Sequence, residues 1–175
     1  TNYLRDHRPD QISDLVRDNI LFGTQLLEAM HAANARHLIN LGSFFQYHDS
    51  TSYCPTNLYA ATKQALEDII GFYREAHGLQ ATTLILYDVY GHGDWRPKLM
   101  NVIRDAVASG EPLNLVPEDT LLDLVHVEDV VSALLQAASQ QTSGGPWAVR
   151  SRERVTVRQV VDAFIKLSGT DLQAN

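Results

Sequence analysis

Apolar side chains recur three or four residues apart over residues 11–35, after a proline and an aspartate that suit a helix start. This spacing predicts a long amphipathic helix. The same criterion predicts further helices over 59–76, 97–109, 128–140 and 157–168. Residues typical of helix caps stand where these helices begin or end: Thr156, Gly78 and Gly169.

Short apolar runs between the helices predict strands over 37–41, 81–87, 122–127 and 147–149. The first run ends at Gly42 and suits a buried parallel strand better than a half-exposed one. Strands that alternate with helices of this length indicate βαβ units, and therefore an α/β fold with a Rossmann-like, doubly wound parallel sheet. The stretch suited to a flexible joint is 140–146.

The beginning of the chain is unusual for such a fold. A doubly wound sheet opens with a strand and a turn, whereas this chain opens with a loop and a helix. We therefore expect the N-terminal strands of the sheet to be missing from this sequence, and the residues present to bind a dinucleotide very weakly on their own.

Composition narrows the function classes. The net charge of -7 and the scattered Lys and Arg residues argue against nucleic acid as a partner. The chain has a single cysteine, Cys54, so no internal disulfide is expected, and this is compatible with a cytoplasmic protein. No segment approaches the roughly 20 apolar residues of a membrane span, so no membrane insertion is expected. The histidines show no metal-ligand spacing, and no metal is expected.

Tyr59 and Lys63 are candidates for proton-transfer chemistry. They stand four residues apart and therefore share one face of the predicted helix. A neighbouring cation favours the phenolate, so this tyrosine can exchange a proton closer to neutral pH. Such a pair is more often an ordinary surface pair, but Ser43 stands at the end of the preceding predicted strand, where open α/β sheets bind ligands. Its hydroxyl can hydrogen-bond the oxygen that the tyrosine protonates.

Five stretches together resemble, in order and spacing, successive motifs of the extended short-chain dehydrogenase/reductases: 19–24, 41–47, 59–63, 86–91 and 123–130. Residues 88–99 look most like the branch of 4-ketoreductases that make CDP-linked dideoxy sugars of the abequose type. This resemblance implies that residues 1–90 form the C-terminal part of a Rossmann-like NAD(P)-binding domain. Residues 91–175 would mix a substrate-binding region with returning Rossmann elements, and would be truncated at the C-terminus.

The resemblance also implies roles for single residues. Ser43 would orient the substrate oxygen, Tyr59 would be the acid/base, and Lys63 would tune Tyr59 and hold the nicotinamide ribose. The cofactor would be NAD or NADP. Tyr87 would lie beside the nicotinamide, and Asn19 near the lysine, although Asn19 fits an ordinary helix–helix hydrogen bond equally well.

Several positions depart from the family pattern. Phe44 and Phe45 occupy the places of an acidic pair that the family's dehydratases use, which disfavours dehydration. Asp88 and Leu122 stand where asparagine and arginine are frequent, so the usual diphosphate clamp is in doubt. Three residues are the candidates for binding the substrate besides Ser43: Asp88, Arg96 and Lys98. The last two can supply positive charge to a phosphate, or can simply lie on a solvated loop.

The leading hypothesis is an NAD(P)-dependent oxidoreductase or epimerase acting on a nucleoside-diphosphate sugar, with reduction of a 4-keto sugar preferred. Two alternatives are a 4-epimerase, which would retain its cofactor tightly, and a non-catalytic sugar-nucleotide-binding module. By the same resemblance we expect a homodimer formed through the helices at 11–35 and 59–76.

Overall fold

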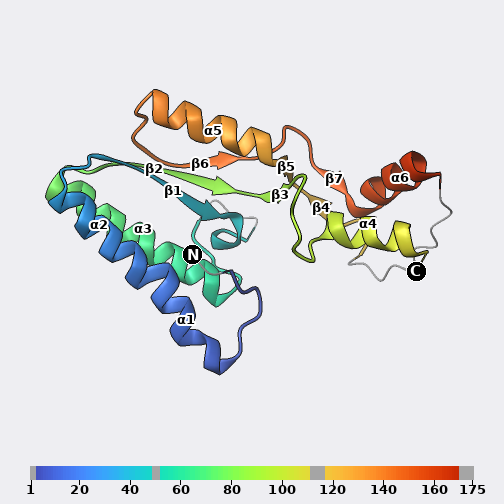
Figure 1. Ribbon diagram of the computed structural model, residues 1–175, viewed down its shortest axis with the longest axis horizontal. Helices are drawn as coiled ribbons and strands as arrows, with labels where there is room; N and C mark the ends of the chain where they lie inside the picture. Colours follow the sequence, from blue (N-terminus) through green and yellow to red (C-terminus); the bar gives the residue numbers. More distant parts are fainter. Residues whose placement is uncertain (1–2, 49–51, 111–116, 170–175) are drawn as a thin grey trace. The chain divides into compact units, whose positions relative to one another are not determined.

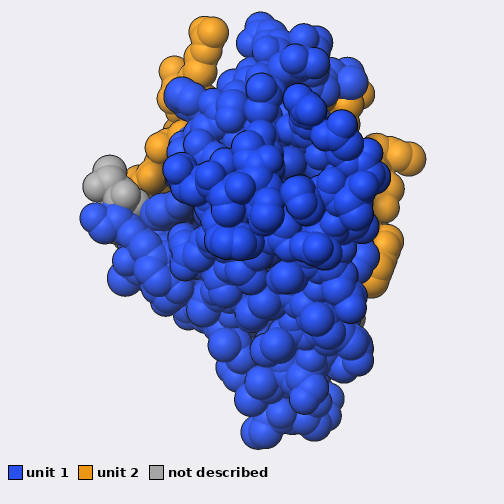
Figure 2. Space-filling model, turned by 90° about the vertical axis from the view of Figure 1, so that its left-hand side faces the viewer, with its two compact units in different colours: residues 1–86, 132–149 blue, residues 87–131, 150–175 orange. Residues whose placement is uncertain are grey.

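The computed structural model describes residues 3–48, 52–110 and 117–169. The chain divides into two compact units, coloured separately in Figure 2. Unit 1 holds residues 1–86 and 132–149, and unit 2 holds residues 87–131 and 150–175. The division expected at residue 90 concerns what each part binds, and it stays a prediction.

The sheet of unit 1 is parallel, as the alternating pattern predicted. Its strand order is β1 (His37–Ser43), β2 (Gln80–Leu86) and β6 (Gly144–Val149). β1 lies at an edge of this sheet and its first five residues are only partly buried, so the expectation of a buried strand is wrong there. β6 begins at Gly144, so the last three residues of the predicted flexible joint at 140–146 belong to the sheet.

The first helical stretch has four segments in direct succession: η1 (Pro9–Gln11), α1 (Ile12–Val16), η2 (Arg17–Leu21) and α2 (Phe22–Ala32). The middle segment η2 is a π-helix, in which hydrogen bonds span one residue more than in an α-helix. The spacing of apolar residues predicted the stretch but not this segment.

Helix α3 (Leu58–His77) packs beside α2, and the two helices cover the same face of the sheet (Figure 1). It ends at Gly78, which has a left-handed φ of 66°, as a C-terminal glycine cap requires. Residues from both helices and from β2 form the buried core of unit 1: Leu27, Leu66, Ile70, Tyr73 and Ala81. Helix α5 (Val127–Ser139), which begins in unit 2 and ends in unit 1, runs along the opposite face of the sheet (Figure 1).

The described residues of unit 2 form two small sheets. β3 (Asp88–Tyr90) pairs in parallel with β5 (Leu124–His126), and β4 (Leu121–Leu122) pairs antiparallel with β7 (Val155–Thr156). The single strand expected over 122–127 is therefore two strands in different sheets, separated by one residue, Asp123.

Two helices of unit 2, α4 (Leu99–Ser109) and α6 (Val157–Ser168), pack on each other. Their core consists of Ile103, Ala106, Val157, Val160 and Val161. Thr156 caps α6 as predicted, since its side chain accepts a hydrogen bond from the N–H of Gln159 at 3.2 Å.

Candidate active site

Ser43 is the last residue of β1 and pairs in register with Leu86, the last residue of β2. Its side chain is buried, and its hydroxyl oxygen accepts a hydrogen bond from the N–H of Phe45 at 3.4 Å. The serine thus caps a short 3-10 turn, η3 (Phe44–Gln46), which turns the chain away from the sheet. Ser43 therefore lies at the carboxyl end of two parallel strands, where this class of sheet binds its ligands.

Gln46 ties this strand end to helix α3. Its side chain is buried; Oε1 accepts from the N–H of Ser43 at 2.9 Å and Nε2 donates to Oε1 of Gln64 at 3.1 Å. Gly42 makes room for it, because a Cβ there would lie 2.9 Å from Gln46 Oε1. Gln46 was not among the residues predicted from the sequence. The signal that could have revealed it is the capping-box spacing, in which glutamine stands three residues after a serine.

Tyr59 and Lys63 lie one turn apart at the start of α3, as the sequence predicted. This start is fixed by Asn57, whose side-chain oxygen accepts from the N–H of Ala60 at 2.8 Å. Tyr59 is half-buried, and its ring meets the ring of Tyr3 edge to face at 5.0 Å between centroids. Tyr59 therefore keeps part of its surface exposed.

Lys63 is a buried cation with only 5% of its surface exposed. Burial lowers the pKa of its ammonium group, and the negative charge of Glu67 partly opposes this. Glu67 itself is held by the side chains of Asn40 and Thr83, which donate to its Oε2 at 2.9 and 2.6 Å. Within the described ranges, the Lys63 ammonium makes no hydrogen bond.

This environment bears on the cofactor that the resemblance implies. A lysine ammonium has three N–H donors, and a buried one that lacks protein acceptors favours a ligand rich in oxygen. The hydroxyl groups of a nicotinamide ribose have that chemistry. The residues present therefore fit the ribose part of NAD or NADP at Lys63.

Asn19 is fully buried in the π-helical segment η2. Its Nδ2 donates to the hydroxyl oxygen of Thr62 at 3.0 Å, and that hydroxyl donates to the carbonyl of Tyr59 at 2.7 Å. The helix–helix hydrogen bond considered in the sequence is thus present, with Thr62 as a partner that was not foreseen. A contact of Asn19 with the cofactor stays a prediction.

The candidate phosphate-binding residues Arg96 and Lys98 lie together in unit 2, around Asp94. Arg96 donates to both carboxylate oxygens of Asp94, at 2.7 and 2.8 Å, and Lys98 Nζ lies 3.3 Å from its Oδ2. The hydrogen bonds from Arg96 hold the pKa of Asp94 well below its usual range. Lys98 also donates to the carbonyl of Val89 at 2.8 Å, so both cations already have acceptors in the protein.

Asp88, the third candidate for substrate binding, begins β3. The pKa of its carboxyl group is raised, mainly by burial and to a smaller extent by the negative charge of Asp123. A hydrogen bond to the backbone and the positive charge of Lys98 partly oppose this rise. Tyr87, the preceding residue, is half-buried and lies under the guanidinium of Arg150, whose Cζ is 5.1 Å from the ring centroid. Arg150 was not foreseen, because it is far from Tyr87 in the sequence.

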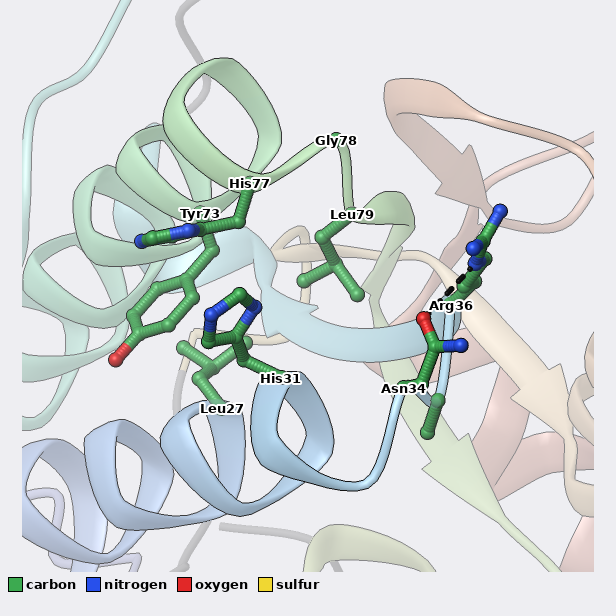
Figure 3. Close-up of a pocket in the computed structure, with 9 residues that line it drawn as sticks. Leu27, His31, Asn34, Arg36, Tyr73, His77, Gly78 and Leu79 are labelled. Atoms are coloured by element: carbon green, nitrogen blue, oxygen red, sulfur yellow. Dashed lines mark hydrogen bonds between the residues drawn. The ribbon is translucent and has the colours of Figure 1, made fainter.

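A cavity of about 310 Å³ lies elsewhere in unit 1, and Figure 3 shows the residues around it. The rings of His31 and His77 face each other there, with centroids 4.2 Å apart, beside Tyr73. The cavity lies where α2 and α3 end and where β1 and β2 begin, which is the amino end of these strands. Ser43 lies at the opposite, carboxyl end, so the cavity takes no part in the candidate site.

Among the residues that the structure describes, no group of three or more His, Cys, Asp or Glu side chains could hold a metal ion. No helix in the same part of the chain combines the length and apolarity needed to cross a membrane.

Comparisons with known proteins add three findings. The model of the NAD dependent epimerase/dehydratase family matches residues 5–149. CDP-abequose synthase from Yersinia pseudotuberculosis is 28% identical over 85% of this chain and 53% of its own length, and that from Salmonella muenchen is 28% identical over 100% of this chain and 60% of its own length. The chain thus spans less than two-thirds of either relative.

Among solved structures, UDP-glucuronic acid 4-epimerase from Bacillus cereus, in complex with NAD, matches with a TM-score of 0.90 at 17% sequence identity. The match covers 97% of this chain and 59% of the epimerase. At this identity the likeness concerns the fold, and it confirms the Rossmann-like arrangement.

Proposed function

The chain belongs to the NAD dependent epimerase/dehydratase family, and on this premise we propose that it acts on a nucleoside-diphosphate sugar as an NAD(P)-dependent oxidoreductase. The preferred reaction is reduction of the 4-keto group of a deoxysugar. The observation that carries the proposal is the position of Ser43, Tyr59 and Lys63 around the carboxyl end of β1 and the start of α3.

In this proposal, each side chain acts at a stated atom of the substrate. The Ser43 hydroxyl hydrogen-bonds the carbonyl oxygen and orients it, and the Tyr59 hydroxyl gives that oxygen its proton. The buried positive charge of Lys63 favours the phenolate that remains and holds the ribose of the cofactor. The nicotinamide, when bound, supplies the hydride for the carbonyl carbon.

Phe44 and Phe45 support reduction over dehydration. They follow Ser43 directly in η3, with ring centroids 4.2 Å apart. Two phenyl rings cannot remove or deliver protons at sugar carbons, as carboxylates can. The likeness to CDP-abequose synthases agrees with the 4-ketoreductase branch that residues 88–99 resemble.

The test is an assay of the intact protein with NADH or NADPH and a nucleoside-diphosphate 4-keto-6-deoxyhexose. We expect oxidation of the reduced cofactor, and no 4-keto-6-deoxy product when the parent NDP-hexose and NAD are supplied instead. Formation of that product, detected by mass spectrometry, would contradict reduction. Cofactor that stays bound through purification and turns over without net oxidation would indicate a 4-epimerase, whereas binding of sugar nucleotide without turnover would indicate a binding module.

A single substitution tests the assigned mechanism. Tyr59→Phe removes the proton donor, and we expect kcat to fall by about 100-fold or more, with substrate affinity changed only a few-fold. Tyr53→Phe is the matched control, because Tyr53 is an exposed tyrosine in the loop before α3. Near-normal turnover by Tyr59→Phe would show that another group transfers the proton.

A further inference from the structure

Arg150 lies just beyond the carboxyl end of a parallel strand. It follows directly on Val149, the end of β6, and Tyr87 follows directly on Leu86, the end of β2; Leu86 and Val149 are paired in register. The carboxyl ends of parallel strands are the positions from which α/β sheets contact their ligands. The guanidinium of Arg150 lies over the Tyr87 ring, with Cζ 5.1 Å from the ring centroid, and this cation–π contact favours that position of the side chain.

Arg150 shares its carboxylate partner with a second arginine. Its Nη2 lies 2.6 Å from Oδ2 of Asp123, and the Nε of Arg154 lies 3.5 Å from the same oxygen. Asp123 is buried, and its other oxygen accepts from the N–H and the hydroxyl of Ser151 at 3.0 and 3.1 Å. The carboxylate of Asp123 therefore faces two guanidinium groups.

Arg150 also keeps access to a ligand. Its side chain is 39% exposed, whereas Asp123 beneath it is 5% exposed. A guanidinium has five N–H donors in a planar fork, and an ion pair at one corner leaves others that can bind phosphate oxygens. The Asp123 pair and the Tyr87 ring thus restrict the arginine before any ligand arrives, which reduces the entropy lost on binding.

Arg96 and Lys98 are the cations that the sequence suggested for binding a phosphate, and both have other contacts in the structure. Arg96 already uses its fork on the two oxygens of Asp94, and the ammonium of Lys98 is shared between Asp94 and a backbone carbonyl. A phosphate group bound there would meet two cations whose charge the carboxylate of Asp94 already offsets in part. At Arg150 it could bind the remaining donors without breaking the contact with Asp123.

We propose that Arg150 binds a phosphate group of a nucleotide ligand, with Tyr87 and Asp123 as the residues that position it. This inference rests on the proposed function, since it names the part of the ligand that this side chain recognises. The phosphate can come from a nucleoside diphosphate, as in a sugar nucleotide, or from the dinucleotide cofactor.

The experiment compares the intact protein with its Arg150→Gln and Arg150→Lys variants by calorimetric titration at constant salt. The probes are cytidine and uridine, their diphosphates, NADH and NADPH. Arg104→Gln is the matched control, because it also removes one positive charge from unit 2, and Arg104 is exposed and paired with Asp105. Thermal unfolding checks that each variant is folded; Arg150→Lys retains the charge that Asp123 requires, and it is decisive if Arg150→Gln does not fold.

We expect Arg150→Gln to weaken binding of the diphosphates by about tenfold or more, and to leave the affinity for the nucleosides unchanged. The loss of diphosphate affinity should be larger than the loss that Arg104→Gln causes. Arg150→Lys should show a smaller loss, because an ammonium lacks the fork. A loss confined to NADH or NADPH would instead assign the phosphate to the cofactor.

Unchanged binding of every phosphate-bearing probe, or equal losses in the Arg150 and Arg104 variants, would overturn the assignment of Arg150. If the unmodified protein bound neither the diphosphates nor the reduced cofactors, the proposed function itself would fall. These two results are distinct, because the second is read from the unmodified protein alone.

Discussion

Lys63 holds an ammonium group in the interior of unit 1, and the nearby carboxylate of Glu67 is already shared by two other donors. Such a group costs stability in the absence of ligand. Buried charges of this kind are common at active sites. A cation that is poorly solvated by the protein interacts more strongly with a phenolate or a ribose.

This cost predicts a stabilising substitution. Burial lowers the pKa of Lys63 below its ordinary value of 10.5, so the folded protein loses this proton before the unfolded chain does. Between the two pKa values the unfolded state binds more protons, and the free energy of unfolding therefore rises with pH. We expect Lys63→Met to have a higher free energy of unfolding than the unmodified protein at pH 7. The part of the pH-dependent increase below pH 10.5 that Lys63 causes should be absent from this variant. Urea titrations at several pH values measure both effects.

Lys166→Met is the control for that experiment, because Lys166 is exposed on α6. The quantity to compare is the change in the free energy of unfolding between pH 7 and higher pH. It is taken for each variant relative to the unmodified protein, because other groups titrate in all three proteins. A Lys63→Met protein that is less stable at neutral pH would mean that the ammonium has acceptors in solution that satisfy its charge.

At the scale of elements, the approach of α2 to α3 depends on one small residue. Gly23 lies in α2 against Leu66 of α3, and a Cβ at Gly23 would lie 2.5 Å from Leu66 Cδ1 and 2.9 Å from Cδ2. Gly71 is also helical, but nothing lies within 4 Å of the Cβ that it would carry. The two glycines form a natural pair for comparison.

We expect Gly71→Ala to raise the free energy of unfolding by up to about 1 kcal/mol, because alanine favours the helix. Gly23→Ala should lower it by up to about 2 kcal/mol, since overpacking costs about 1–3 kcal/mol and the same gain in propensity offsets about 1 kcal/mol of that cost. Chemical denaturation of the two variants measures both values. Equal stabilisation by both substitutions would show that Leu66 can move aside at little cost.

Element boundaries were predictable where local chemistry sets them. Gly78 and Thr156 act as caps in the structure because cap geometry depends on neighbouring residues alone. The start of β6 was missed because Gly144 and Gly145 resemble a turn, yet Thr82 on β2 pairs with Gly144. A partner strand more than 50 residues away decides that assignment, and no local pattern reveals it.

The same reasoning separates the parts of the candidate site. Ser43, Tyr59 and Lys63 could be named as candidates from the sequence, because each stands at a recognisable place on one strand end or one helix turn, and their roles stay predictions. Arg150 could not be named, because the ring and the carboxylate that it contacts are brought to it only by the fold.

At the scale of the whole molecule, unit 1 exposes large apolar residues on the helices that were expected to form a dimer. Phe22 and Leu26 of α2 are 55% and 42% exposed, and Phe72 of α3 is 58% exposed. Large apolar residues gathered on a surface are typical of interfaces. We therefore keep the homodimer through residues 11–35 and 59–76 as a proposal.

Charge placed on those helices should dissociate the dimer. We expect Phe22→Glu and Phe72→Glu each to shift the intact protein from dimer to monomer in sedimentation equilibrium, because a buried unpaired carboxylate costs several kcal/mol. Leu167→Glu, at an 88% exposed site on α6, should leave the mass unchanged. A dimer that survives both helix substitutions would place its interface elsewhere.

The interleaving of the two units has a consequence for how such a protein can change over generations. The chain passes between the units after Leu86, after Val131 and after Val149, so unit 2 is encoded in two separated stretches of the gene. A single recombination event cannot exchange unit 2 as a module. A crossover between residues 87 and 150 would join Tyr87 from one parent to Arg150 from another, and would separate a pair in contact. Substitution at individual codons is therefore the more accessible route by which unit 2 can acquire a new preference.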